Sequence, residues 1–73
     1  MNDREAEFLA MLADVLEVPS IAPEDDYRRM HLWGSLTAFA LKVTVAQRYG
    51  RDLKLGEICE FPNAGELMRR VLS

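Results

Sequence analysis

The stretch from Ser35 to Tyr49 contains neither glycine nor proline, and Gly34 and Gly50 lie directly on either side of it. Glycine suits the left-handed conformation that stops a helix, and Arg48 near that end complements the helix dipole. Apolar residues recur through the stretch at helical spacing. We therefore expect one helix over residues 35–49, around which the rest of a short chain must fold.

This central helix has more apolar surface than a single core contact needs. The two apolar sides are formed by Leu36, Phe39, Val43 and the stem of Lys42, and by Leu41, Val45 and Tyr49. Two explanations stay open at this point. Either the helix is deeply buried, or it has a second apolar strip that faces a partner.

A second amphipathic helix is expected over residues 3–17, where apolar residues recur at the i, i+4, i+7 and i+8 positions. Asn2 or Asp3 can cap its start. Val18-Pro19 ends it, because the residue before a proline avoids the α region. The apolar stripe consists of Phe8, Leu12, Val15 and Leu16, with Met11 beside them.

A long connection, residues 20–34, joins these two helices. A loop of this length in a small domain usually serves a function or carries a helical turn of its own. We expect Ile21, Leu32 and Trp33 to hold it against the core. Its acidic cluster, Glu24-Asp25-Asp26, lacks the alternating ligands and terminal glutamate of an EF-hand. The cluster is interpreted as solvated charge, and no metal ligand is predicted.

Two shorter helices complete the expected fold. One lies around residues 57–61 and is broken by Pro62. Asn63 caps the last helix, with Glu66 as its reciprocal partner in a capping box. The anchors expected around the short helix are Leu53, Leu55, Ile58 and Phe61. The layout predicts an all-α chain: a small four-helix bundle with a long loop between helices 1 and 2, a short third helix, and residues 1–73 as a single domain.

Composition and charge argue against several classes of function. The net charge is −3, and without a basic stripe the chain lacks what nucleic-acid binding requires. No segment has the length and apolarity of a membrane span or the pattern of a secretory signal. A single cysteine, Cys59, cannot form an internal disulfide, which fits a reducing, cytoplasmic setting. Cys59 is expected to be buried, and the chain is expected to be a monomer. With one histidine, one cysteine and no metal-ligand spacing, no catalytic residue is predicted and the chain is not expected to be an enzyme.

The residues around Ser35 resemble the modification site of acyl carrier proteins. In that family a loop closes on an Asp-Ser-Leu triplet, sometimes preceded by tryptophan, and Trp33-Gly34-Ser35-Leu36 is similar to it. The helix that follows in the family ends on an aromatic residue and a glycine, as this one does at Tyr49-Gly50. Asn63-Ala64-Gly65-Glu66-Leu67 resembles the start of the family's last helix. The likeness covers nearly the whole chain, and the joint spacing is more specific than any single motif.

The resemblance implies a 4′-phosphopantetheine arm joined to Ser35 through a phosphodiester and carrying an acyl or aminoacyl thioester. The unpaired N–H groups at a helix start would stabilise that phosphate. The implied partners are a phosphopantetheinyl transferase and the cargo-loading or cargo-using enzymes of a specialised fatty-acid, polyketide or nonribosomal pathway. The residues expected to bind these partners are Trp33, Gly34, Leu36, Ala40, Lys42 and Val43.

The chain departs from the family in two places. Gly34 stands where the family has the aspartate that helps the transferase and its metal ion engage the serine. The central helix carries no acid, whereas the family's is usually acidic on its exposed face, so partners of this chain would offer an apolar or acidic patch. Two alternatives therefore stay open: a degenerate, unmodified carrier-like interaction module, and a Ser35 that serves only as a helix N-cap.

Overall fold

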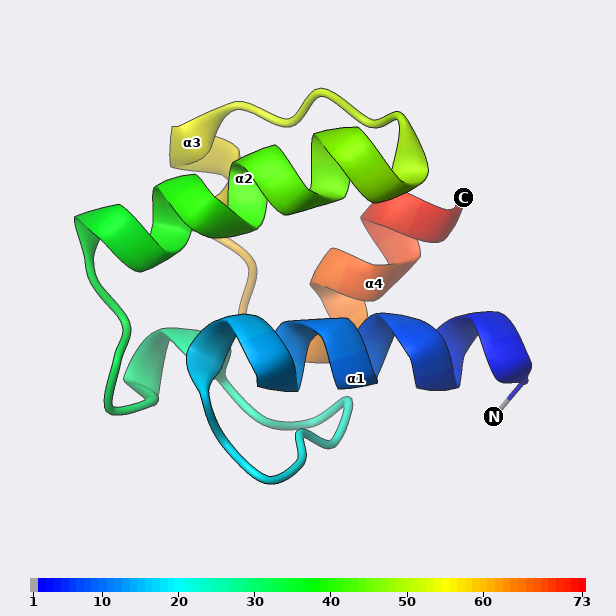
Figure 1. Ribbon diagram of the computed structural model, residues 1–73, viewed down its shortest axis with the longest axis horizontal. Coiled ribbons are helices and arrows are strands. Elements are labelled where there is room, and N and C mark those ends of the chain that lie inside the picture. The colour runs from blue at the N-terminus through cyan, green and yellow to red at the C-terminus, as the bar shows by residue number, and fades with distance from the viewer. Residues whose placement is uncertain (1) are drawn as a thin grey trace.

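The computed structural model describes residues 2–73, and their regular structure is entirely helical. Four α-helices and one 3-10 turn follow in order: α1 (Asp3–Leu16), η1 (Tyr27–Arg29), α2 (Ser35–Tyr49), α3 (Leu55–Ile58) and α4 (Ala64–Leu72). The long loop between α1 and α2 and the short third helix are both present (Figure 1). The predicted all-α fold is confirmed. No helix of the described residues is long and apolar enough to cross a membrane.

α1 begins with a complete capping box. The Asn2 side chain accepts a hydrogen bond from the Glu5 N–H at 2.9 Å, and the Glu5 carboxylate accepts one from the Asn2 N–H at 3.1 Å. The helix ends one residue earlier than predicted, because Glu17 adopts a left-handed conformation with φ 55°. The Val18 N–H then donates to the Ala13 carbonyl, so the chain leaves the helix before Pro19 imposes its own restriction.

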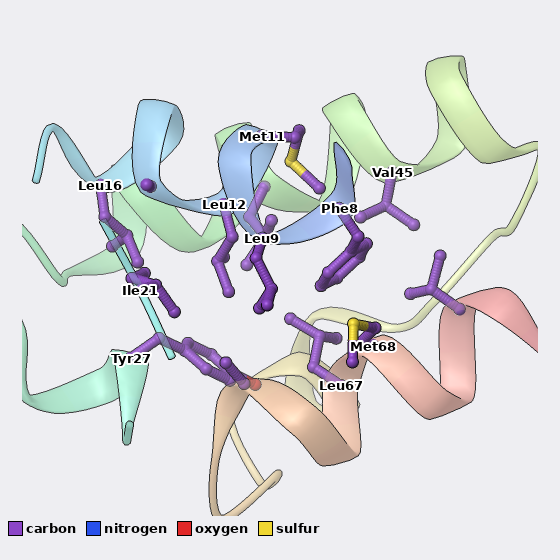
Figure 2. Packing of buried hydrophobic residues seen from close by; sticks show 14 of the residues in the cluster. Phe8, Leu9, Met11, Leu12, Leu16, Ile21, Tyr27, Val45, Leu67 and Met68 are labelled. Atoms are coloured by element: carbon purple, nitrogen blue, oxygen red, sulfur yellow. The ribbon is translucent and has the colours of Figure 1, made fainter. Parts of the chain in front are cut away.

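The apolar sides of α1, α2 and α4 meet in one core, shown in Figure 2. The predicted α1 stripe is buried there, except for Val15, which is half-buried. α2 contributes only one of its two apolar sides to this core. The side chains with at most 1% exposure include Phe8, Leu12, Leu16, Tyr27, Leu41, Val45, Leu53, Ile58 and Leu67.

The long loop is held to the core by Ile21, as predicted, and by Tyr27, which sequence reasoning did not single out. The buried Tyr27 hydroxyl donates to the Ile58 carbonyl at 2.5 Å. Trp33 packs edge-on against the Tyr27 ring, with centroids 5.3 Å apart. The prediction for Leu32 is wrong: this residue is 39% exposed, and its neighbours Tyr27 and Trp33 make the contacts between this part of the loop and the core.

Two members of the acidic cluster shape the loop instead of being merely solvated. The Asp25 carboxylate accepts from the Ala22 N–H at 2.9 Å. Asp26 caps η1 by accepting from the Arg28 N–H at 3.0 Å, and it also pairs with the Arg28 guanidinium at 2.9 Å. Only Glu24 is an exposed acid of the kind predicted for all three.

α3 and α4 differ from the predictions in detail. α3 covers Leu55–Ile58 instead of residues 57–61, and the exposed Cys59 follows it, so the predicted burial of Cys59 is wrong. Asn63 caps α4 as predicted, accepting from the Glu66 N–H at 2.9 Å. The Glu66 carboxylate, however, lies 3.7 Å from Arg69, and the reciprocal half of the capping box is absent from α4.

The start of α4 is tied to the long loop. The Ala64 N–H donates to the Asp25 carbonyl at 2.8 Å, and the Gly65 N–H donates to the Pro23 carbonyl at 2.7 Å. These bonds occupy two donors that an α-helix leaves unpaired at its start. The loop, α3 and α4 are therefore bonded to one another.

Candidate functional site

Ser35 is the first residue of α2, and Gly34 before it occupies the N-cap position. The Gly34 carbonyl accepts the first intrahelical bond, from the Ala38 N–H at 2.9 Å. Gly34 has no side chain to cap the helix, and the exposed Ser35 hydroxyl makes no hydrogen bond within residues 2–73. The N-cap explanation for Ser35 is therefore wrong. Its hydroxyl is free at the mouth of the helix.

The backbone around Ser35 suits a negatively charged group. The first N–H groups of an α-helix lack intrahelical partners, and the helix dipole is positive at that end. The first turn of α2 contains no acidic residue that would neutralise this field. A phosphate ester on the Ser35 oxygen would lie beside these N–H groups, so the residues present fit the attachment of a phosphodiester.

The segment before Ser35 is fixed from both ends. The Thr37 hydroxyl donates to the Leu32 carbonyl at 2.6 Å, which fastens the loop to the first turn of α2. The Trp33 N–H donates to the Met30 carbonyl at 3.1 Å, and the half-buried Trp33 ring rests on Tyr27. Trp33, predicted to bind a partner, thus also serves to support the loop. The turn that precedes Ser35 is therefore held in place by hydrogen bonds and by the packing of Trp33.

One side of α2 faces the protein core, and another side faces solvent. Ala38, Leu41 and Val45 are buried, whereas Leu36 is 87% exposed and Phe39 is 56% exposed. The helix is therefore not deeply buried on all sides, and the explanation that it has a second, exposed apolar strip is the one the structure supports. Sequence reasoning had placed Phe39 in that strip without naming it as a partner-binding residue.

The remaining predicted partner-binding residues differ in their surroundings. Ala40 is exposed and Val43 is half-buried, so both can border the strip. The Lys42 ammonium lies 3.0 Å from the Asp52 carboxylate, so its charge is already paired within the chain. Leu55, expected to be a core anchor, is instead 39% exposed on α3.

η1, in the loop that precedes Ser35, has paired charges and a buried phenol. The hydrogen bond from Arg28 keeps the pKa of Asp26 below its ordinary value. Arg28 also donates to the Cys59 carbonyl at 3.1 Å, which links η1 to the end of α3. Burial raises the pKa of Tyr27, so its hydroxyl stays a neutral donor to Ile58. These groups tie the loop to α3, and none of their hydrogen bonds is to Ser35.

Two surface hollows lie along α1, away from Ser35. One is bordered by α1 and the end of α2, including Glu7, Asp14 and Arg48. The other is bordered by α1 and residues 18–23. Neither is lined by any residue of 32–43. The exposed strip of α2 is thus an outer surface, not the wall of either hollow.

Comparison with known families agrees with this geometry. A family model described as a phosphopantetheine attachment site matches residues 6–71. The chain belongs to this family. The match spans α1 to α4 and includes Ser35 at the start of α2. No curated protein and no solved structure matches the chain.

Membership confirms the resemblance to phosphopantetheine-dependent carrier proteins. The covalent cofactor of such carriers is 4′-phosphopantetheine, whose terminal thiol holds cargo as a thioester. The four-helix arrangement, the long loop and the helix that begins at a serine are those expected of such a carrier. This chain is therefore a carrier domain by family.

Proposed function

We propose that Ser35 carries the 4′-phosphopantetheine arm and that residues 1–73 act as one carrier domain. The observation that carries this proposal is the free Ser35 hydroxyl at the uncapped, acid-free start of α2, in a chain of the attachment-site family. Attachment forms a bond between the serine oxygen and the phosphorus of coenzyme A. It breaks the phosphoanhydride bond of coenzyme A, releasing adenosine 3′,5′-bisphosphate and a proton.

The other hydroxyls of the chain are less suited to attachment. Thr37 donates to the Leu32 carbonyl, Thr44 to the Ala40 carbonyl and Ser73 to the Arg70 carbonyl. Ser20 is exposed, but it lies in the loop after α1 with no helix start beside it. Ser35 combines a free hydroxyl with the positive end of a helix dipole.

In this function the chain holds and presents cargo and does no chemistry itself. It works in the cytoplasm as a monomer, where a phosphopantetheinyl transferase loads the arm. Enzymes of a specialised biosynthetic pathway then load and use an acyl or aminoacyl cargo. The residues proposed to meet these enzymes around Ser35 are Trp33, Gly34, Leu36, Ala40, Lys42 and Val43.

Intact mass spectrometry tests the proposal directly. The protein is incubated with coenzyme A and a broad-specificity phosphopantetheinyl transferase. The unaltered chain and a Ser20→Ala control should both gain one phosphopantetheine unit, and Ser35→Ala should gain none. No gain in the unaltered chain, or an equal gain in Ser35→Ala, would overturn the assignment of Ser35.

A second candidate is an unmodified, carrier-like interaction module. Gly34 favours it, because the acid found before the serine in the carrier family is absent. This candidate expects partners to bind the unmodified protein, with Ser35→Ala binding as tightly as the parent. Binding that required the modified serine would exclude it.

A further inference from the structure

The exposed large apolar side chains of residues 2–73 are gathered at α2 and the segments that touch it. We call them the α2 patch: Leu32, Leu36, Phe39 and Leu55. The Leu32 carbonyl is bonded to the first turn of α2, and α3, which starts at Leu55, packs against α2. Apolar side chains that are clustered, instead of scattered singly, mark an interaction surface.

The charged side chains from Tyr27 to Arg51 are all basic, whereas two exposed acids, Asp52 and Glu60, lie on either side of α3. Two of the bases here are already paired, Arg28 with Asp26 and Lys42 with Asp52. Arg29 and Lys54 are exposed and make no ion pair within residues 2–73. Arg29 lies in η1, shortly before Leu32, and Lys54 directly precedes Leu55.

Four of the seven exposed acidic side chains of residues 2–73 lie on another element. Asp3, Glu7, Asp14 and Glu17 are all exposed on α1 or at its end. Their spacings of four, seven and three residues place them along one side of that helix, opposite the side that enters the core. The molecule therefore has an acidic side on α1 and an apolar, basic region at α2.

We infer that the α2 patch docks a partner protein whose contact surface is apolar and bordered by carboxylates. The apolar surface would contact Leu36 and Phe39, and the carboxylates would face Arg29 and Lys54. A partner with a basic surface would be repelled, because like charges across an interface cost binding energy. This inference rests on the proposed function, since a carrier must dock with the enzymes that load and use its arm.

An anionic membrane fits the molecule less well than such a partner. The patch offers two unpaired bases, whereas binding to anionic lipid depends on clusters of several. The net charge of the whole chain is −3, which opposes approach to a negative surface. The membrane is therefore included as an alternative outcome of the test.

The test uses two helical peptides with the same leucine face, one bordered by glutamates and the other by lysines. Each is titrated into the isotope-labelled full chain at low ionic strength, and the amide signals are followed by NMR. The glutamate peptide should shift the signals of Leu36, Phe39 and Leu55. It should bind at least about tenfold more tightly than the lysine peptide, with a difference that narrows at high salt.

Two charge-matched double variants locate the effect. Arg29→Glu with Lys54→Glu should abolish or reverse the preference for the glutamate peptide. Arg4→Glu with Arg69→Glu changes the net charge equally, at exposed bases on α1 and α4, and should leave the preference intact. Phe39→Ala should weaken the binding of both peptides about equally, because it removes an apolar contact and no charge.

Several results would overturn the inference. They are tighter binding of the lysine peptide, binding of neither peptide, and shifts that leave the signals of the α2 patch unchanged. An equal loss of the preference for the glutamate peptide in the two double variants would also overturn it. Shifts of the same signals with phosphatidylserine vesicles but not with the glutamate peptide would point to a membrane instead. The peptide experiment does not depend on modification. A chain that binds the glutamate peptide but gains no mass at Ser35 would overturn the proposed function alone.

Discussion

Tyr27 connects the long loop to α3 through one buried hydroxyl, and this contact should give the protein a characteristic loss of stability at high pH. The ordinary pKa of tyrosine is 10.0, and burial raises the pKa of Tyr27 in the folded state. The phenol therefore stabilises the fold fully below pH 10.0, and that stability is lost as the pH rises toward the folded-state pKa. The expected loss is about 1.4 kcal/mol per pH unit in this range.

Urea unfolding between about pH 8 and about pH 11 measures this dependence. Tyr27→Phe should remove most of the slope. It should also cost about 1–3 kcal/mol near neutral pH, because the Ile58 carbonyl loses its donor. Tyr49→Phe is the matched control: burial also raises the pKa of Tyr49, but its ring lies at the core's edge, so most of the slope should persist. An unchanged slope in Tyr27→Phe would contradict the role given to its hydroxyl.

Gly34 can be replaced without strain, and an aspartate there should stabilise the protein. Its backbone is extended, with φ 176°, and an added Cβ would meet no atom within 4 Å. The carboxylate introduced by Gly34→Asp could accept a bond from the first turn of α2 and would face the positive end of the helix dipole. This substitution should therefore add about 0.5–1 kcal/mol, a few tenths from capping in place of glycine and the rest from the helix dipole, and raise Tm by roughly 2–8 °C.

Thermal unfolding monitored by circular dichroism tests this expectation, with Gly34→Ala as the control that lacks a capping oxygen. Gly34→Ala should not raise Tm, because alanine is a poor N-cap residue. A fall in Tm for both variants would show that the fold needs glycine at this position. The result also bears on why Gly34 stands in place of the aspartate usual in the family, because the backbone at residue 34 has room for a side chain.

The sequence predicted residues with a local role better than residues whose role depends on distant contacts. Asn2, Gly50 and Asn63 act at helix ends as expected, because capping is decided within a few residues. Tyr27 was not singled out, since its partner Ile58 lies 31 positions away. Cys59 was wrongly expected to be buried, because its exposure depends on where α3 stops. The free state of the Ser35 hydroxyl likewise depended on whether the first helical residue is 35 or 36, that is, on whether Gly34 or Ser35 is the N-cap.

At the scale of elements, the two apolar sides of α2 should respond differently to truncation. Leu41→Ala removes a fully buried side chain and should cost about 2–5 kcal/mol of unfolding free energy. Leu36→Ala removes one that is 87% exposed and should change the unfolding free energy by less than about 0.5 kcal/mol. Chemical denaturation of each variant gives these values.

Leu41→Met serves as a milder substitution should Leu41→Ala fail to fold, with an expected cost below about 1.5 kcal/mol. A loss in Leu36→Ala as large as that in Leu41→Ala would mean that the exposed strip stabilises the fold. The strip would then need no partner to explain it. A Leu36→Ala chain that is stable but docks poorly would show that the exposed side of α2 serves recognition, whereas the buried side serves stability.

Helical periodicity predicted the long helices well and the short one less accurately. α1 and α2 have enough turns for an apolar stripe to be recognised, and the structure ends them within one residue of the prediction. α3 has four residues, little more than one turn, so periodicity could not fix its place. Leu53 and Ile58 are both part of the buried core, and these contacts between distant residues determine where the helix lies. The sequence also left open which side of α2 faces the core, because that depends on α1 and α4.

For the molecule as a whole, the loop that carries Ser35 should unfold together with the helices. Tyr27 bonds the loop to α3, and the loop carbonyls of Pro23 and Asp25 accept from the start of α4. Trp33 rests on Tyr27, so its fluorescence reports on the loop, whereas circular dichroism reports on the helices. Because these contacts join all parts to one core, the two signals should give coincident urea transitions with one midpoint. Tyr27→Phe weakens one of the ties and should let the Trp33 transition move to lower urea than the helical one. If the Trp33 transition already precedes the helical transition in the unaltered protein, the loop before Ser35 unfolds independently of the helices. A carrier of that kind would present its arm from a mobile loop and not from a fixed turn.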